Sequence, residues 1–281
     1  MKVVDQVIPL EDDTAGGFRE VSVSDSGNLV AATANNGSLY VYLTELTVLG
    51  AACGNRLGFL SSLNEVTLFE TGVGLGGARN DTKKIALSIE PSFIGMGPYH
   101  FCAGLNNKAV FHILDMVDTK PIVHEYASTI KSISVGIDYS VALLSDGRLY
   151  LQIIENNSIQ PERESKIFPE SNQAKLSPIV SASIKGEMLI YSTRNGKVHY
   201  FLLDEWSEVN CYEHPSQLKH IFPDQAATRL LLVDENSRGS IYSPVDDSLL
   251  EIDDFSATIQ GCLWDSEDSH VFCTWVCKIN A

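Results

Sequence analysis

Residues 189–203 read LIYSTRNGKVHYFLL, and this stretch decides the fold. Two short runs rich in aliphatic, β-branched and aromatic side chains meet at Asn195-Gly196. An Asn-Gly pair between such runs is the strongest short-range signal of a β-hairpin, because both central residues of a type I′ turn need a positive φ. The stretch therefore predicts two antiparallel strands joined at Asn195-Gly196.

The same strand–turn–strand pattern returns along the chain. Each unit has two turns, and an aliphatic residue followed by a ring stands after the second one, as Val198 is followed by His199. The units are residues 18–43, 93–114, 130–153, 179–203 and 218–242, with a further start at 259–276 and a degenerate copy at Asn64-Glu65-Val66. The aligned pairs are Leu39-Tyr40, Val110-Phe111, Leu149-Tyr150, Val198-His199 and Ile241-Tyr242. Their spacing centres on about 40–45 residues, which is typical of propeller blades.

This period predicts an all-β fold, a WD-type β-propeller of antiparallel four-stranded blades. One small sheet cannot bury both of its faces, so blades stack face to face around an axis. We expect an incomplete propeller of about five full blades plus partial ones. It would form a single domain over residues 1–281, with a partial strand and linker at 1–17. Two short segments, residues 46–53 and 164–168, are candidates for helix.

The composition is that of a globular protein, with 44% hydrophobic and 20% charged residues. Lys and Arg number 20 and Asp and Glu number 36, which gives a net charge of −16. This charge argues against nucleic acid or an anionic membrane surface as the main partner. The chain has no signal-peptide pattern and no apolar run of 18 residues, so we expect no membrane insertion. Its six cysteines form no C-x-x-C pair, which favours free, buried thiols in a reducing cytosol.

A glycine motif invites a cofactor hypothesis. Gly72, Gly74 and Gly77 match G-x-G-x-x-G after a predicted strand. A dinucleotide site needs a helix that begins at the third glycine, but the residues that follow are polar and lead into another strand. We therefore predict an inter-strand loop over residues 70–83 and no cofactor.

The remaining polar motifs also favour structural roles. The acidic pairs Asp12-Asp13, Asp246-Asp247 and Asp253-Asp254 lack the spacing of a calcium loop and are typical of turns. No H-x-x-x-H and no G-x-S-x-G elbow occurs, and Cys273 and Cys277 share one face of a strand. His199 takes a place that Tyr or Phe holds in the sister units, and we expect it half-buried on a blade face. The sequence predicts no catalytic, cofactor-binding or metal-ligating residues and assigns no binding residues.

Three stretches go beyond a generic propeller. They are residues 38–68, 89–114 and 209–265, and the last contains His214-Pro215, Ile221-Phe222-Pro223-Asp224 and Val233-Asp234-Glu235. Together they resemble the second WD-type propeller of the intraflagellar transport protein one-four-four family, also called WD repeat protein nineteen. The resemblance covers residues 18–265 and identifies the chain as a fragment of a larger architecture, with a preceding propeller and a following helical solenoid.

The resemblance implies a non-enzymatic scaffold of intraflagellar transport complex A, which serves retrograde transport, membrane-cargo trafficking and cilium assembly. The implied partners are the other complex A subunits and adaptor proteins for membrane cargo. The implied location is the cytoplasm, the ciliary base and the cilium, in association with the cytoskeleton. Two alternatives stay open: a generic coat or signalling propeller, and a propeller hydrolase with carboxylates in its central channel.

Overall fold

The computed structural model describes residues 16–24, 29–43, 49–74, 77–115, 119–155, 163–169, 177–252, 259–265 and 268–276. Across these ranges the chain folds into β-strands β1 to β25, which confirms the all-β prediction. In the same ranges no helix has the length and apolar character needed to cross a membrane. The chain divides into two compact units, Met1–Val48 and Leu49–Ala281. The single domain over 1–281 stays a prediction, and a partial strand within residues 1–15 would lie outside the described residues.

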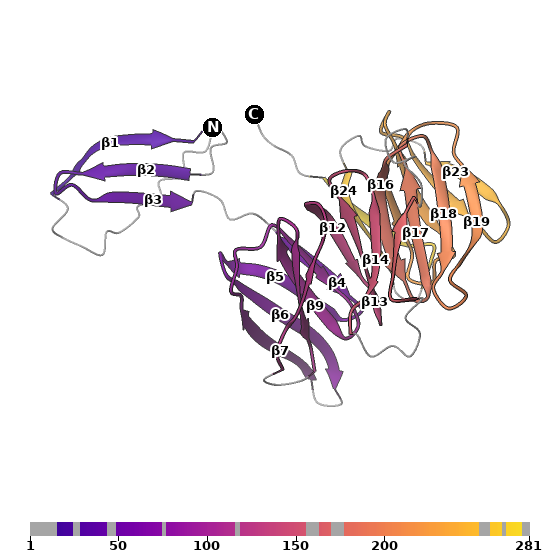
Figure 1. Ribbon diagram of the computed structural model, residues 1–281, viewed down its shortest axis with the longest axis horizontal. Helices are drawn as coiled ribbons and strands as arrows, with labels where there is room; N and C mark the ends of the chain where they lie inside the picture. The colour runs from indigo at the N-terminus through magenta and orange to yellow at the C-terminus, as the bar shows by residue number, and fades with distance from the viewer. Residues whose placement is uncertain are drawn as a thin grey trace. The chain divides into compact units, whose positions relative to one another are not determined.

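The first unit contains one three-stranded antiparallel sheet in the order β1-β2-β3 (Figure 1). Its aliphatic side chains Leu39 and Val41 are exposed, whereas Tyr40 and Tyr42 on the other face are half-buried and stack on each other. The strands are β1 (Phe18–Val23), β2 (Leu29–Ala34) and β3 (Leu39–Leu43).

The described residues of the second unit form five four-stranded sheets and a two-stranded one, each an antiparallel meander of consecutive strands. The prediction of about five four-stranded blades plus partial ones is confirmed, but the predicted full unit at residues 18–43 is a three-stranded sheet of the first unit, and a blade at residues 50–86 takes its place in the count. The first two sheets are β4 (Gly50–Cys53), β5 (Arg56–Ser62), β6 (Glu65–Gly74) and β7 (Gly77–Ala86), and β8 (Phe93–Met96), β9 (His100–Leu105), β10 (Lys108–Ile113) and β11 (Ile122–Glu125). The next two are β12 (Ile130–Val135), β13 (Tyr139–Leu144), β14 (Leu149–Ile153) and β15 (Ser165–Phe168), and β16 (Ile179–Lys185), β17 (Met188–Thr193), β18 (Lys197–Leu202) and β19 (Ser207–Glu213). The last are β20 (Leu218–Pro223), β21 (Leu230–Asp234), β22 (Gly239–Ser243) and β23 (Ser248–Ile252), and the pair β24 (Ile259–Trp264) and β25 (Phe272–Val276).

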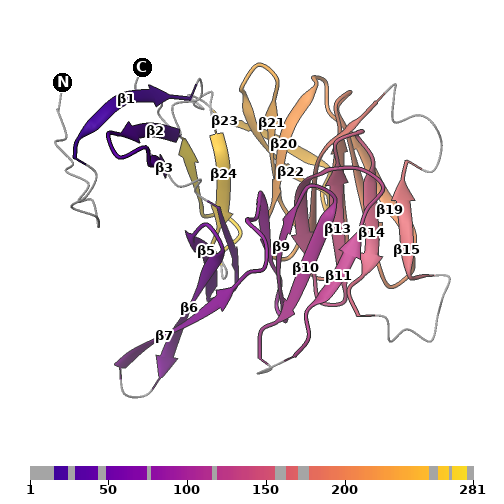
Figure 2. The ribbon, with the colours of Figure 1, turned by 60° about the vertical axis from the view of Figure 1, so that its left-hand side comes forward.

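The sheets of the second unit stack in chain order. The first strand of each sheet contacts the first strand of the next, from β4 to β8, β12, β16, β20 and β24. Figure 2 shows the sheet of β9, β10 and β11 beside the sheet that contains β13 and β14. The first strands therefore lie innermost, and the later strands fan outward as propeller blades do.

The hydrophobic core lies between the sheets. Leu149 and Leu151 of β14 pack against Leu189 and Phe201 of the following sheet, and Tyr200 of β18 packs against the sheet after that. Because Phe201 and Tyr200 point to opposite faces, one sheet contributes to two cores. This arrangement explains why the middle strands are apolar on both faces.

Hydrogen bonds also join successive sheets near the innermost strands. The Ile184 amide donates to Ser134 Oγ at 3.0 Å, and the Ile221 amide donates to Ser181 Oγ at 3.4 Å. The Trp264 indole Nε1 donates to the Phe222 carbonyl at 2.9 Å. Each of these bonds gives an acceptor to a backbone or indole N–H group that the stacking of the sheets removes from water.

The Asn195-Gly196 turn differs from its prediction. Gly196 has a φ of +96°, but Asn195 does not have a positive φ, and the Gly196 amide donates to the Thr193 carbonyl. The two strands are therefore joined by a longer turn, and not by a two-residue type I′ turn. Gly196, the fourth residue of this turn counted from Thr193, has the left-handed conformation. Equivalent bonds run from Gly37 to Ala34, Gly147 to Leu144 and Ser237 to Asp234.

Four further predictions are wrong in detail. Strand β4 occupies the end of the first proposed helix, and β15 occupies most of the second, because sheet pairing supplies hydrogen bonds that such short helices would lack. The degenerate copy at Asn64 is a turn within a complete blade, β4 to β7. The proposed loop over residues 70–83 is an extension of the hairpin β6–β7, whose ladder continues to Gly74 and Gly77.

Candidate functional site

The innermost strands enclose a cavity of about 390 Å³ within the second unit. Glycines allow these strands to approach closely, since a Cβ on Gly97 would lie 2.7 Å from the Gly136 carbonyl oxygen. A Cβ on Gly136 would in turn meet the Ile184 side chain at 2.8 Å. The lining comes from β4, from residues 94–96, 133–137 and 183–186, and from Pro98 and Gln225.

Lys185 is the charged residue of this lining. Burial lowers the pKa of its ammonium group, and the nearby Cys53, Asp224 and Cys262 oppose that shift. Burial likewise raises the pKa of the Cys53 thiol, and it raises that of Cys262 to about 12. The thiols are therefore protonated near neutral pH and are poor nucleophiles.

The described lining contains no Asp or Glu. A hydrolase of the kind weighed above needs at least two carboxylates that converge on the axis. The small and apolar residues that line the cavity, together with one lysine, do not supply such a pair.

Two buried aspartates of the C-terminal stretch serve turns. Asp224 is 2% exposed and accepts hydrogen bonds from the Thr228 amide at 2.8 Å, the Thr228 hydroxyl at 2.7 Å and the Arg229 amide at 3.1 Å. Asp234 is 4% exposed and accepts from Ser216 Oγ at 3.0 Å and the Arg238 amide at 2.7 Å. Both buried carboxylates accept hydrogen bonds from the turns of their own blade, so the motif that they belong to is structural.

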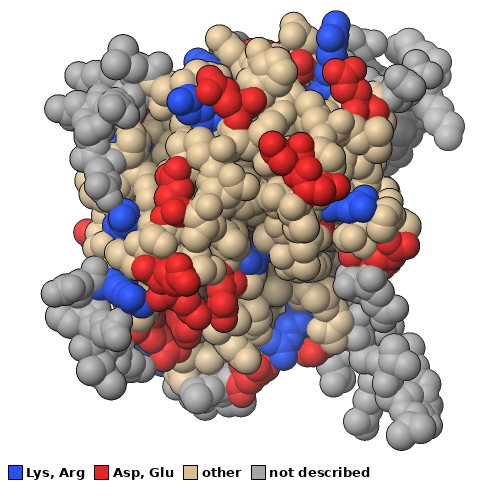
Figure 3. Space-filling model, turned by 90° about the vertical axis from the view of Figure 1, so that its right-hand side faces the viewer, with Lys and Arg blue, Asp and Glu red and all other residues tan. Residues whose placement is uncertain are grey.

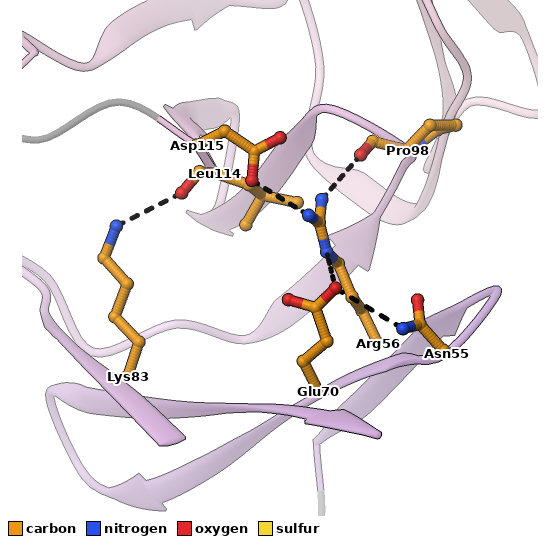
Figure 4. A network of polar contacts seen from close by, with 7 residues as sticks. All are labelled: Asn55, Arg56, Glu70, Lys83, Pro98, Leu114 and Asp115. Carbon is orange, nitrogen blue, oxygen red and sulfur yellow. Dashed lines mark hydrogen bonds and ion pairs between the residues drawn. The ribbon is translucent and has the colours of Figure 1, made fainter. Parts of the chain in front are cut away.

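A polar junction joins the first two blades of the second unit (Figure 4). Arg56 contacts Asp115 through Nη2 at 2.8 Å and Glu70 through Nε at 3.3 Å, and it donates from Nη1 to the Pro98 carbonyl at 2.9 Å. Lys83 donates to the Leu114 carbonyl at 3.2 Å across the same junction.

A smaller cavity of about 190 Å³ lies at this junction. Leu68, Phe69, Met96 and Leu114 form its apolar walls, and the ion pairs of Arg56 border it. Arg56 is largely covered, with 23% of its side chain exposed, so its ion pairs fix one blade against the next.

The glycine motif does not form a nucleotide site. Gly72 pairs with Arg79 and Gly74 with Gly77 in the β6–β7 ladder. The third glycine therefore begins a strand, and no helix N-terminus is available to bind a pyrophosphate.

The acidic pair Asp246-Asp247 lies in the turn between β22 and β23, as predicted. Asp247 has a φ of +49° and accepts a hydrogen bond from the Tyr242 hydroxyl at 2.9 Å. The residues Asp12, Asp13, Asp253, Asp254 and Cys277 lie outside the described part of the chain.

The histidines lie mostly as predicted, but the prediction of buried thiols holds among the described cysteines only for Cys102, because Cys211 and Cys273 lie on outer strands and are exposed. His199 is half-buried on a face of β18, with 18% of its side chain exposed. His112 and His124 are half-buried in strands, and burial lowers the pKa of each. Each cysteine that the structure describes is a free thiol.

No prediction from the sequence concerns the buried histidine His100. His100 is 5% exposed, and its Nε2 lies 2.9 Å from Glu155 Oε1. The two residues are 55 positions apart, so only the stacking of two sheets brings them together.

The surface carries the excess negative charge. On the face that Figure 3 shows, acidic side chains gather in several groups, and lysines and arginines are scattered between them. Together with the net charge of −16, this distribution disfavours polyanions as ligands of that face.

Comparison with known proteins agrees with the fold. A family model described as the WDR19 second beta-propeller matches residues 57–278. WD repeat-containing protein 19 of Mus musculus is 39% identical over 258 residues, and its counterpart of Homo sapiens is 38% identical over 258 residues. Each of these alignments covers 91% of this chain and 19% of the relative.

A more distant relative is WD repeat-containing protein dyf-2 of Caenorhabditis elegans, which is 27% identical over 269 residues. That alignment covers 87% of this chain and 19% of the relative, so the chain spans about a fifth of the length of the relatives it matches. The matches confirm the resemblance that residues 38–68, 89–114 and 209–265 indicate. The chain therefore belongs to the WD repeat-containing protein 19 family and corresponds to the second β-propeller of that family.

Proposed function

We propose that this chain is the propeller part of a non-catalytic scaffold subunit of intraflagellar transport complex A. Membership of the WD repeat-containing protein 19 family is the observation that carries the proposal. The alignments cover 19% of the relatives' length, so in this proposal the chain is one part of a longer subunit. In this role it supports retrograde ciliary transport, membrane-cargo trafficking and cilium assembly.

The geometry of the second unit supports a non-catalytic role. Its central cavity is lined by Lys185 and the protonated Cys53 thiol among mostly small and apolar residues. The buried carboxylates of Asp224 and Asp234 are engaged by hydrogen bonds within their own blade. Rigid stacked blades hold their connecting loops in fixed positions, which suits a surface that binds other proteins.

The partners that this function requires are the other complex A subunits and adaptor proteins for membrane cargo. The protein would act in the cytoplasm, at the ciliary base and in the cilium, in association with the cytoskeleton. A net charge of −16 disfavours nucleic acid and anionic membranes as partners and favours basic protein surfaces.

Affinity purification from ciliated cells tests the proposal. The natural protein that contains this chain is tagged at its own locus, and its associated proteins are identified by mass spectrometry. We expect the other complex A subunits to co-purify with the wild-type protein and with the exposed-site control Leu39→Ala. The core variant Leu189→Ala is expected to lose them.

Two outcomes would contradict the proposal. One is a stable, folded protein that co-purifies with no complex A subunit. The other is association with coat or signalling proteins outside the cilium, which would favour the generic propeller alternative.

A further inference from the structure

Three residues with metal-ligating side chains meet on one face of the sheet β16–β19. They are His199 on β18 and Glu208 and Cys211 on β19, and their ligand atoms all lie within 4.8 Å of one another. We propose that His199, Glu208 and Cys211 form a binding site for a zinc ion at the outer edge of this blade.

A β-bulge creates the cluster. His199 lies directly opposite Cys211 in the ladder, so these two side chains share a face. Residues three apart on a regular strand point to opposite faces, which would send Glu208 away from Cys211. The ladder shifts between Tyr200 and Phe201, so that Phe201 pairs with Glu208 and one extra residue stands on β19. The extra residue reverses the alternation and turns Glu208 toward His199 and Cys211.

The distances suit a small transition metal. His199 Nδ1 lies 3.2 Å from Glu208 Oε2. Zinc binds nitrogen and oxygen at roughly 2.0–2.2 Å and thiolate sulfur at about 2.3 Å, so donor atoms around one ion lie roughly 3–4 Å apart. The observed spread of 4.8 Å is within reach of small rotations of Glu208 and Cys211, whose side chains are exposed and free to move.

The histidine is held in place before any ion binds. Its ring stacks on the Tyr191 ring with centroids 4.7 Å apart and planes 13° apart, and 18% of the side chain is exposed. The other two ligands are more exposed, with 46% of the Glu208 side chain accessible. The site therefore combines one fixed ligand with an open side, through which an ion and a water as fourth ligand can enter.

The donor set selects the metal. One imidazole, one carboxylate and one thiol suit zinc, whereas calcium and magnesium prefer oxygen ligands throughout. Zinc binding would release the proton of the Cys211 thiol, and the Glu208 carboxylate would offset part of the charge of the ion.

The cluster is specific to this blade. At the corresponding positions of the preceding sheet, Tyr150 pairs with Ile167, and in the following sheet Ser240 pairs with Glu251. Neither pair offers an imidazole or a thiol. His199 therefore replaces the ring of Tyr150 in the preceding sheet, while the following sheet has Ser240 at this position, and not Tyr242 as the sequence alignment predicts.

Titration of the tag-free full chain with Zn²⁺ in a calorimeter tests the site, and Co²⁺ serves as the spectroscopic probe. We expect one Zn²⁺ per chain, and with Co²⁺ a thiolate charge-transfer band together with the visible bands of a tetrahedral site. His199→Phe keeps a ring on Tyr191 and removes the nitrogen, and Cys211→Ser removes the sulfur. Each is expected to weaken Zn²⁺ binding by at least about 100-fold, since loss of an outer-shell partner alone costs 10–100-fold.

Matched controls separate the site from general effects of charge and thiols. Glu213→Gln removes a neighbouring charge, Cys273→Ser removes an exposed thiol on β25, and both should retain wild-type affinity. Circular-dichroism melting without metal confirms that the variants fold. The proposal is overturned if the wild-type chain binds no Zn²⁺ saturably, or if either His199→Phe or Cys211→Ser binds Zn²⁺ as the wild type does.

Discussion

The sheet β16–β19 and the sheet β1–β3 are built from the same local signals and have different environments. Both contain an Asn-Gly turn with a left-handed glycine, at Gly196 and Gly37. Leu189 of the first sheet is fully buried between neighbouring sheets, whereas Leu39 of the second is 64% exposed. Turn chemistry therefore sets the hairpin in both sheets, and stacking alone supplies the burial that stabilises a blade.

The largest expected effect comes from removing the same side chain in both sheets. Leu189→Ala should lower the free energy of unfolding by about 2–5 kcal/mol, because it leaves a cavity between two sheets. Leu39→Ala should change it by less than about 0.5 kcal/mol, because that side chain already contacts water. Urea-dependent hydrogen exchange, which reports on both units, measures the two effects. Equal destabilisation by the two substitutions would contradict the comparison.

The second test replaces the glycine of each turn. Gly37→Ala meets no heavy atom within 4 Å and incurs only the strain of a positive φ, about 1 kcal/mol. Gly196→Ala incurs the same strain, and its Cβ would also lie 2.7 Å from the carbonyl oxygens of His214 and Ser216. We expect a loss of about 3 kcal/mol at Gly196. The same hydrogen-exchange experiment measures this loss of stability. A loss no larger than that at Gly37 would show that residues 214–216 move away from the new Cβ at little cost in free energy.

A third, smaller effect concerns the hydrogen bonds between sheets. Ser134→Ala removes the acceptor of the Ile184 amide and should cost about 1 kcal/mol, because that amide is left without its partner. Ser22→Ala, at an exposed position of β1, should cost less than about 0.5 kcal/mol. The exchange rate of the Ile184 amide, measured by nuclear magnetic resonance, should rise in the Ser134 variant only.

The smallest effect is expected inside the central cavity. Burial lowers the pKa of Lys185, so the unfolded chain binds its proton more tightly than the folded one does. Stability should then rise with pH over the interval between the lowered folded-state pKa and the ordinary value of 10.5. Lys185→Met should remove this contribution and raise the stability at pH 7 by less than about 1 kcal/mol. The difference between the urea midpoints of the two proteins, measured from pH 7 to 10.5, isolates Lys185 from other titrating groups. A difference that does not change with pH would contradict the prediction.

Most of the blade architecture follows from the sequence, because each sheet pairs consecutive strands through short turns. The sequence pattern does not identify the blade β4–β7. Its second turn, at Leu63-Asn64, lacks the Asn-Gly or Asp-Gly pair that marks the turns at Asn195-Gly196 and Asp146-Gly147. At the Asn106-Asn107 hairpin the sequence pattern also assigns the wrong residues to the core. This turn is shorter than the other second turns, so Ala109 and Phe111, and not Val110, face the next core.

The candidate sites depend on geometry that spacing does not contain. The cavity lining combines four inner strands, and the His100–Glu155 contact needs two stacked sheets. The pairing of His199 with Cys211 could be anticipated from a hairpin centred on residues 203–206, since both strands are visible in the sequence. The bulge that brings in Glu208 has no such signal, because Val209 is an ordinary strand residue.

The stacking of the sheets in chain order has a consequence for the synthesis of the protein. Within each sheet all pairings join neighbouring strands, and each sheet contacts the one made just before it. No sheet of the series β4 to β25 draws a strand from a distant part of the described chain. The strands of each blade can therefore pair as soon as the blade leaves the ribosome, and the blade before it presents a face on which the new blade can pack. The second unit can thus grow by successive addition, one blade at a time, as its translation proceeds.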